Sequence, residues 1–266
     1  MEPVGGRVID PSLILPALLS GAAIGFILGL IGGGGSILAV PLLVHFVGVR
    51  SPHVAIGTAA VAVALSALVG LVGHARAGTV KWRCGAVFAA SGVVGALSGA
   101  TLGKAVDGQR LLLLFGGLMI GIGLSMLRKR QAQPSPDVRL TKDNAAHLLP
   151  RLVPTGFGVG LLSGFFGIGG GFLIVPGLIA AAAMPIANAI GTSLLAVAAF
   201  GLSTTASYAV SGLVDWPLVG VLVAGGIAGS FGGIWLGGRL AHRKRTLEVT
   251  FAVLVVVVGT YVMLKA

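Results

Sequence analysis

Two glycine-rich stretches carry the clearest chemical signal in this chain of 266 residues. The first reads GLIGGGGSILAVPLL (residues 29–43), and the second reads GFFGIGGGFLIVPGL (residues 164–178). Glycine tolerates φ > 0 and lets a ligand approach the backbone closely. A helix that begins after such a break presents free N–H groups and the positive end of its dipole, which both favour an anion. The two stretches therefore predict broken membrane helices that bind an anion.

The glycines also have a packing interpretation. Gly21, Gly25 and Gly29 recur at four-residue spacing, which is typical of close helix–helix contact in membranes. The consecutive runs are longer than packing requires, so we assign them to the site. No Lys-Ser or Lys-Thr follows either run, which excludes a phosphate-binding nucleotide loop.

Hydroxyl and amide side chains lie close to the glycine runs in the sequence. Each half contains the tetrapeptide AIGT, at residues 55–58 and again at residues 189–192. The alternative for each hydroxyl is a bond to its own helix. The predicted substrate-binding residues are Gly33, Gly34, Gly35, Ser36, Thr58, Gly169, Gly170, Gly171, Asn188, Thr192 and Ser193.

The composition is that of a membrane protein. Hydrophobic residues make up 56% of the chain, charged residues make up 9%, and the mean hydropathy is +1.03. Several apolar stretches reach the length of ~20 residues that a membrane helix needs. Because lipid cannot satisfy an open backbone, the spans must be helical. We predict an all-α polytopic membrane protein with about eight to ten membrane segments.

The chain repeats itself internally. A shift of 135 residues aligns Gly29 with Gly164 and Pro41 with Pro176, and after a one-residue slip the AIGT motifs coincide. The polar stretch between the halves reads as an aqueous linker because it holds three prolines and many charges. We predict a first membrane repeat at residues 1–127, a cytoplasmic linker at 128–151 and a second repeat at 152–266.

The first apolar stretch, residues 11–49, is too long for one span. As a helix it would extend about 58 Å, nearly twice the hydrocarbon thickness. A hairpin at the glycines gives five segments per half, and an odd number makes the two repeats inverted. With both termini outside, the inside loops then carry 13 of the 18 Lys and Arg residues, compared with 11 for four single spans per half.

Several functions are disfavoured by what the sequence lacks. All seven acidic residues lie in termini, loops or span ends, so no carboxylate is available for a cation or a proton in mid-membrane. The single cysteine excludes an internal disulfide and a cysteine metal cluster, and the five scattered histidines match no catalytic motif. We predict no enzyme, no cofactor and no nucleic-acid partner. His74 and Arg76 end a span, where interfacial anchoring and substrate contact are the two alternatives.

The duplicated motif, a glycine-rich break with a trailing Val-Pro followed by an Ala-x-Gly-Thr helix, resembles the TauE/SafE sulfite exporter family, also called the TSUP family. The resemblance covers nearly the whole chain. It implies a multi-pass protein of the bacterial inner membrane, in contact with lipid, that moves sulfite, thiosulfate or organosulfonates such as sulfoacetate.

Other functions stay open at this point. The chain could carry or conduct another small anion, such as a carboxylate, or be a non-transporting membrane subunit, and a homodimer is also open. Export is the predicted direction, because an inside-negative potential contributes about 2.3 kcal/mol per charge per 100 mV and removes the need for a coupling ion.

Overall fold

A computed structural model describes residues 11–31, 33–127, 144–167, 171–239 and 244–265. Every secondary-structure element in these ranges is helical. The elements are α1 (Pro11–Ile31), the 3₁₀ segment η1 (Gly33–Leu38), α2 (Ala39–Pro41), the π-helical segment η2 (Leu42–Val47), α3 (Pro52–Arg76), α4 (Trp82–Ala105), α5 (Gly108–Leu127), α6 (Ala145–Phe166), α7 (Gly171–Ala182), α8 (Ile186–Val210), α9 (Trp216–Arg239) and α10 (Lys244–Lys265).

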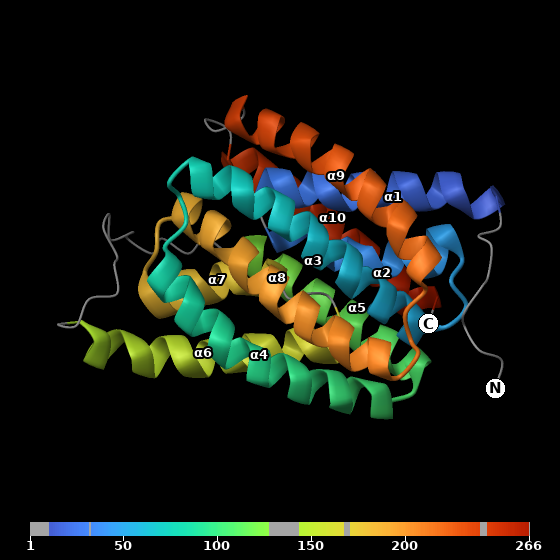
Figure 1. The fold of residues 1–266 in the computed structure, drawn as a ribbon, viewed down its shortest axis with the longest axis horizontal. Helices are drawn as coiled ribbons and strands as arrows, with labels where there is room; N and C mark the ends of the chain where they lie inside the picture. Colours follow the sequence, from blue (N-terminus) through green and yellow to red (C-terminus); the bar gives the residue numbers. More distant parts are fainter. Residues whose placement is uncertain (1–10, 32, 128–143, 168–170, 240–243, 266) are drawn as a thin grey trace.

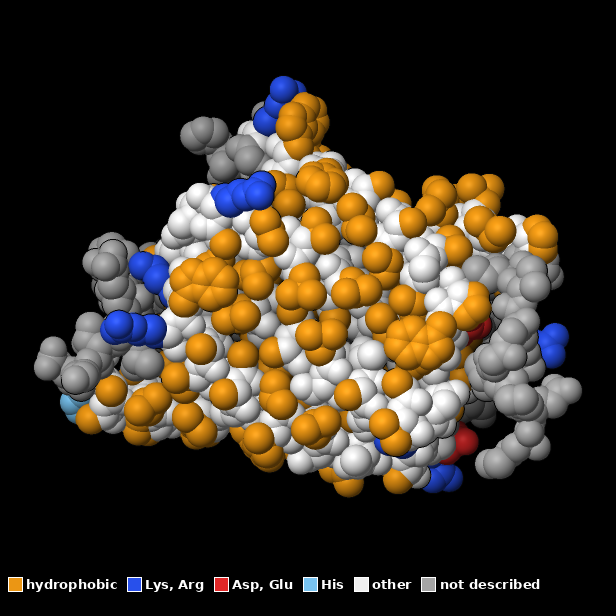
Figure 2. Space-filling model, in the orientation of Figure 1, with side chains coloured by type: hydrophobic (Ala, Val, Ile, Leu, Met, Phe, Trp, Pro, Cys, Tyr) orange, Lys and Arg blue, Asp and Glu red, His pale blue; other side chains and the backbone are white. Residues whose placement is uncertain are grey.

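The helices have the lengths and the surface of a membrane protein. Seven of those described are long and apolar enough to cross a membrane, and three shorter apolar segments accompany them at Gly35–Val47, Gly171–Ala182 and Val249–Lys265. Figure 2 shows hydrophobic side chains across the middle of the molecule and charged side chains mainly toward its ends. The prediction of an all-α polytopic membrane protein is confirmed.

Both glycine-rich stretches break a helix and reverse the chain. After α1 ends at Ile31, the chain folds back so closely that a Cβ at Gly35 would meet the backbone of Ile24 and Leu28. In the second half, α6 ends at Gly167 with a left-handed φ of 65°, and α7 packs against α6. The predicted hairpin in each half is therefore confirmed.

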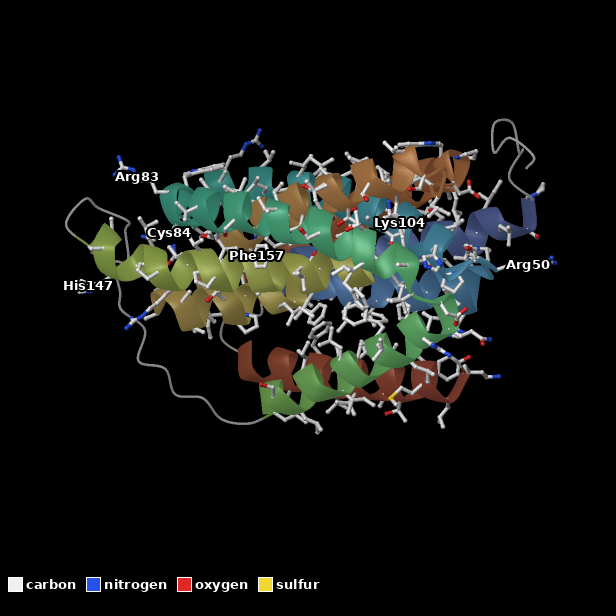
Figure 3. The ribbon with its side chains drawn as sticks, turned by 90° about the horizontal axis from the view of Figure 1, so that it is seen from below. Arg50, Arg83, Cys84, Lys104, His147 and Phe157 are labelled. Atoms are coloured by element: carbon white, nitrogen blue, oxygen red, sulfur yellow. The ribbon has the colours of Figure 1, made fainter. Side chains whose placement is uncertain are left out.

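The two halves pack together through helix pairs, and each pair takes one helix from each half. The most extensive helix–helix contacts are those of α1 with α9 and of α4 with α6, so the first helix of each half lies on the third long helix of the other. In Figure 1, α3 and α8 lie between these two pairs, and α3 is the most buried of the seven long helices. Helices α5 and α10 form a further pair to one side, visible in Figure 3. This symmetry supports the predicted repeat, whose inverted orientation in the membrane stays a prediction.

Glycines make the exchanged contacts possible. A Cβ at Gly25 of α1 would strike the backbone of Gly226 in α9, and a Cβ at Gly160 of α6 would strike the backbone of Gly92 in α4. These positions correspond in the repeat. The packing role predicted for the four-residue glycine spacing is therefore confirmed.

One boundary differs from the expectation. Helix α6 begins at Ala145, inside the stretch that the sequence assigns to the linker, and it continues through Pro150 and Pro154. The linker residues 128–143 lie outside the described residues. The polar residues before Leu152 suggested an aqueous connection, but Ala145, Ala146, Leu148 and Leu149 suit a helix that extends beyond the apolar span.

Candidate functional site

The two glycine breaks, which the sequence separates by 135 residues, lie together in the structure. Segment η1 packs against α7, and both contact α8. Gly35 and Gly171 are buried, and Ser36 has no exposed surface. Gly33 and Gly34 belong to η1, whereas Gly169 and Gly170 lie outside the described residues. The structure thus brings the described parts of the two predicted half-sites into contact.

The segments that meet at the two glycine breaks are uncharged. Neither residues 33–41 nor residues 171–182 contain a charged side chain. Helix α7 has twelve residues, and the N–H groups of its first turn have no partner within the helix. These donors and the positive dipole end of α7 favour an anion. The groups available to it are backbone N–H groups and hydroxyls.

A buried hydroxyl near the second break was missed by the sequence reasoning. Ser163 of α6 lies one helical turn before Gly167, has no exposed surface, and its Oγ has no hydrogen-bond partner among the described residues. A buried hydroxyl without a hydrogen-bond partner calls for an explanation, and a ligand that accepts a hydrogen bond from it provides one. The available signal was a serine inside an apolar helix, one turn before a glycine break.

Thr58 and Thr192 hold the two halves together through equivalent bonds. The Thr58 Oγ1 atom accepts a hydrogen bond of 3.0 Å from the backbone N–H of Asp215, just before α9. The Thr192 Oγ1 atom accepts one of 2.9 Å from the backbone N–H of Lys81, just before α4. Lys81 and Asp215 are matched positions of the repeat. Each threonine therefore anchors the start of a helix that belongs to the other half.

The structure does not bring these two threonines together. Thr192 lies near the start of α8, and Asp215, which holds Thr58, lies beyond the end of that helix at Val210. The 18 residues from Thr192 to Val210 rise about 27 Å. A small anion cannot contact hydroxyls so far apart, so we assign both threonines to the architecture of the bundle.

The remaining polar residues of the predicted site are also engaged. The Asn188 Nδ2 atom donates to the carbonyl oxygen of Thr79 at 2.9 Å, and the Ser193 Oγ atom donates to Ile190 of its own helix at 2.7 Å. His74, at the end of α3, has its Nδ1 atom 3.1 Å from the Thr79 hydroxyl. Asn188 and His74 thus join Thr192 in fixing the turn between α3 and α4.

Metal chemistry finds no support in the described part of the chain. These residues contain no group of three or more His, Cys, Asp or Glu side chains that could hold a metal ion. Cys84 is buried near the start of α4 and forms no disulfide.

Comparison with known proteins points to one family. The model of the family described as "Sulfite exporter TauE/SafE" matches residues 17–262. A probable membrane transporter protein of Xylella fastidiosa (strain Temecula1) is 49% identical over 247 residues, which cover 93% of this chain and 94% of that protein. The probable membrane transporter protein YunE of Bacillus subtilis (strain 168) is 28% identical over 262 residues, covering 90% and 93% of the two chains. No solved structure matches this chain.

Proposed function

Because the chain belongs to the TauE/SafE sulfite exporter family and is a multi-pass membrane transporter, we propose that it exports small sulfur oxyanions across the inner membrane. The proposed substrates are sulfite, thiosulfate and organosulfonates such as sulfoacetate. The observation that carries this proposal is the contact between the two glycine breaks, in a part of the bundle without a charged side chain.

The chemistry of the breaks suits an oxyanion. Such an ion presents several oxygen acceptors, and it loses several kcal/mol of solvation when it enters the bilayer. The N-terminal N–H groups of α7 can replace part of that hydration because glycine leaves room for close approach. A partial helix-end charge binds an anion less tightly than a buried arginine would, and this favours release.

The paired helices suit alternating access. Each half contributes a glycine hairpin, and the contacts of the two halves correspond to one another. Inverted repeats with broken helices at the midplane are typical of secondary transporters. We propose that both termini lie outside and the linker inside, so that the membrane potential drives the anion outward.

Flux measurements in proteoliposomes test the substrate. We expect radiolabelled sulfite, thiosulfate or sulfoacetate to move faster than acetate, and an inside-negative potential to accelerate exit. Acetate flux that exceeds the flux of all three sulfur anions would favour a carboxylate carrier.

Ser163→Ala tests the position of the site with little risk to folding, because the hydroxyl has no partner to lose among the described residues. Loss of a hydrogen bond to an anion should weaken binding by about 2 kcal/mol, a factor of roughly thirty. Ser98→Ala is the matched control, since Ser98 lies on the exposed face of α4 and donates to its own helix. Unchanged affinity in the Ser163 variant would remove this hydroxyl from the site.

A further inference from the structure

A polar cavity lies at one end of the bundle, away from the glycine breaks. It has a volume of about 540 Å³ and is formed where η2, the start of α3, the start of α5 and the end of α10 meet. Its polar lining consists of His45, Arg50, His53, Asp107, Gln109 and Lys265, and we call it the end cavity. Figure 3 shows Arg50 at this end, opposite Arg83 and His147.

We propose that the end cavity is a second binding site for a small oxyanion, occupied as the substrate passes this end of the transporter. The role in transport rests on the proposed function, but binding itself does not. In the proposed topology this end faces the outside, so during export the cavity would receive the anion after it leaves the glycine breaks.

The charge of the lining favours an anion. Arg50 and Lys265 are cations, and Asp107 is the one carboxylate among the lining residues. The Asp107 Oδ1 atom already accepts hydrogen bonds from the backbone N–H groups of Gln109, at 3.1 Å, and Arg110, at 3.3 Å. Two cations and one carboxylate give the lining a net positive charge, and the cap at α5 already engages one oxygen of that carboxylate.

Two imidazoles offer unused polar atoms at the cavity. The Nε2 atoms of His45 and His53 are buried, and neither has a hydrogen-bond partner in the described part of the chain. The His45 ring is held edge-on against Tyr261, with centroids 5.3 Å apart. A buried nitrogen without a partner is costly, and an oxyanion that accepts from Nε2–H relieves that cost.

Helix ends add to this field. Helix α3 begins at the cavity with Pro52, where the Ser51 hydroxyl accepts from the backbone N–H of Val54 at 3.4 Å, and α5 begins there with Gly108. Both helices are at least 20 residues long. The positive ends of these two helices reinforce the two cationic side chains, against the negative C-terminal end of α10, which also lies at the cavity.

The end cavity also breaks the internal repeat. Ala180 and Ala187 stand in the second half at the positions of His45 and His53, and Arg50 lies where the first half has one extra residue. The packing glycines and the two threonine anchors are retained in both halves. The polar lining is therefore not a by-product of the duplicated fold.

Chemical labelling of a single cysteine tests the proposal without any need for transport. Gln109→Cys, in a Cys84→Ser background, places an exposed thiol on the cavity wall. The anionic reagent 2-sulfonatoethyl methanethiosulfonate is compared with its cationic trimethylammonium counterpart. Ala105→Cys is the control, because Ala105 is exposed at the end of α4 and does not line the cavity.

The measured quantity is the labelling rate with the anionic reagent divided by the rate with the cationic one. We expect this rate ratio to be about tenfold higher for the Gln109→Cys variant than for the Ala105→Cys variant. Sulfate should slow labelling of the Gln109→Cys variant alone when it replaces chloride at equal ionic strength. Arg50→Gln and Lys265→Gln should each lower the rate ratio, whereas Arg110→Gln, which removes an exposed cation outside the lining, should leave it nearly unchanged.

Equal ratios in the two cysteine variants, or an effect of Arg110→Gln as large as that of Arg50→Gln, would overturn the proposal in favour of a generally positive end. Failure of the proposed function has a different signature, since sulfur-anion flux would be absent while the labelling pattern stayed intact.

Discussion

At one end of the bundle the backbone of Asp215 donates to Thr58, and at the other end the backbone of Lys81 donates to Thr192. The turns before these donors are also alike, since Gly78 has a φ of 66° and its counterpart Gly212 a φ of 67°. The side chains are not alike. The end with Thr58 and Asp215 carries the end cavity, whereas alanines replace its two histidines at the opposite end.

This difference separates two kinds of residue. Features that occur in both halves, such as the packing glycines and the threonine anchors, serve the architecture that both halves share. Features that occur in one half, such as His45 and the buried hydroxyl of Ser163, have no matching residue in the other half and are not needed for the shared architecture. We therefore expect substitutions of the first kind to change stability equally in both halves, and substitutions of the second kind to change transport.

The largest expected effect comes from the exchanged helix pairs. Gly25→Ala and Gly160→Ala place a methyl group against the backbone of Gly226 and Gly92, which cannot move without separating the helices. Each variant should lose about 3 kcal/mol of stability, measured by unfolding of the purified protein in detergent.

Gly117→Ala and Gly220→Ala are the controls, because a Cβ at either position meets nothing within 4 Å. They should be neutral or slightly stabilising, as alanine favours helices. A large loss at Gly25 with none at Gly160 would break the equivalence of the two halves.

The next effect concerns the threonine anchors. Thr58→Val and Thr192→Val keep the shape of the side chain but leave the N–H of Asp215 or Lys81 without its acceptor. Each change should destabilise the protein by about 1–2 kcal/mol, and serine at either position should restore most of the loss. Thiosulfate affinity, measured by calorimetry on the folded fraction, should not change. Weaker binding at unchanged stability would return the threonines to the site.

The parts of the fold that could be predicted from the sequence are those that depend on one segment of the chain. The breaks, the hairpins and the repeat were predictable because glycine runs and apolar length act locally, within one segment of chain. The packing of α1 and α6 against helices of the other half was not predictable, since it depends on which glycine faces meet between distant segments: Gly92 and Gly160 are 68 residues apart, and Gly25 and Gly226 are 201 apart.

The candidate site was predictable for a similar reason only in part. Glycine breaks in the sequence predict free backbone groups, but the sequence does not show which group a hydroxyl bonds to. Thr58 and Thr192 were matched in sequence and so were assigned to one anion, whereas repeat symmetry places them near opposite ends of α8. The end cavity could not be predicted from the sequence, because its lining residues come from four elements scattered between His45 and Lys265.

A smaller effect should appear at one end alone. The Lys104 Nζ atom donates to the Ser207 carbonyl at 3.0 Å and to the Ser211 hydroxyl at 2.9 Å, so its charge lies at the C-terminal end of α8. In the repeat its position corresponds to Gly238, which has no such group. Lys104→Met should lower stability by about 1 kcal/mol, measured as a shift in Tm, and Lys104→Arg should lower it less. No change in Tm would mean that the contact to α8 is too exposed to contribute.

The smallest effect tests one residue of the backbone symmetry. Ala183 has a φ of 48°, and the matching position in the first half is Gly48, with a φ of 84°. A left-handed alanine costs about 1–2 kcal/mol, while glycine costs roughly 0.5–1 kcal/mol in chain entropy on folding.

Ala183→Gly should therefore stabilise the protein by about 0.5 kcal/mol, and Gly48→Ala should destabilise it by about 1 kcal/mol. Nothing lies within 4 Å of a Cβ at Gly48, so the second change measures the backbone preference without a clash. Opposite signs in denaturant unfolding are the expected result. If both variants lowered stability, the methyl group of Ala183 would have a packing role that its exposed position does not indicate.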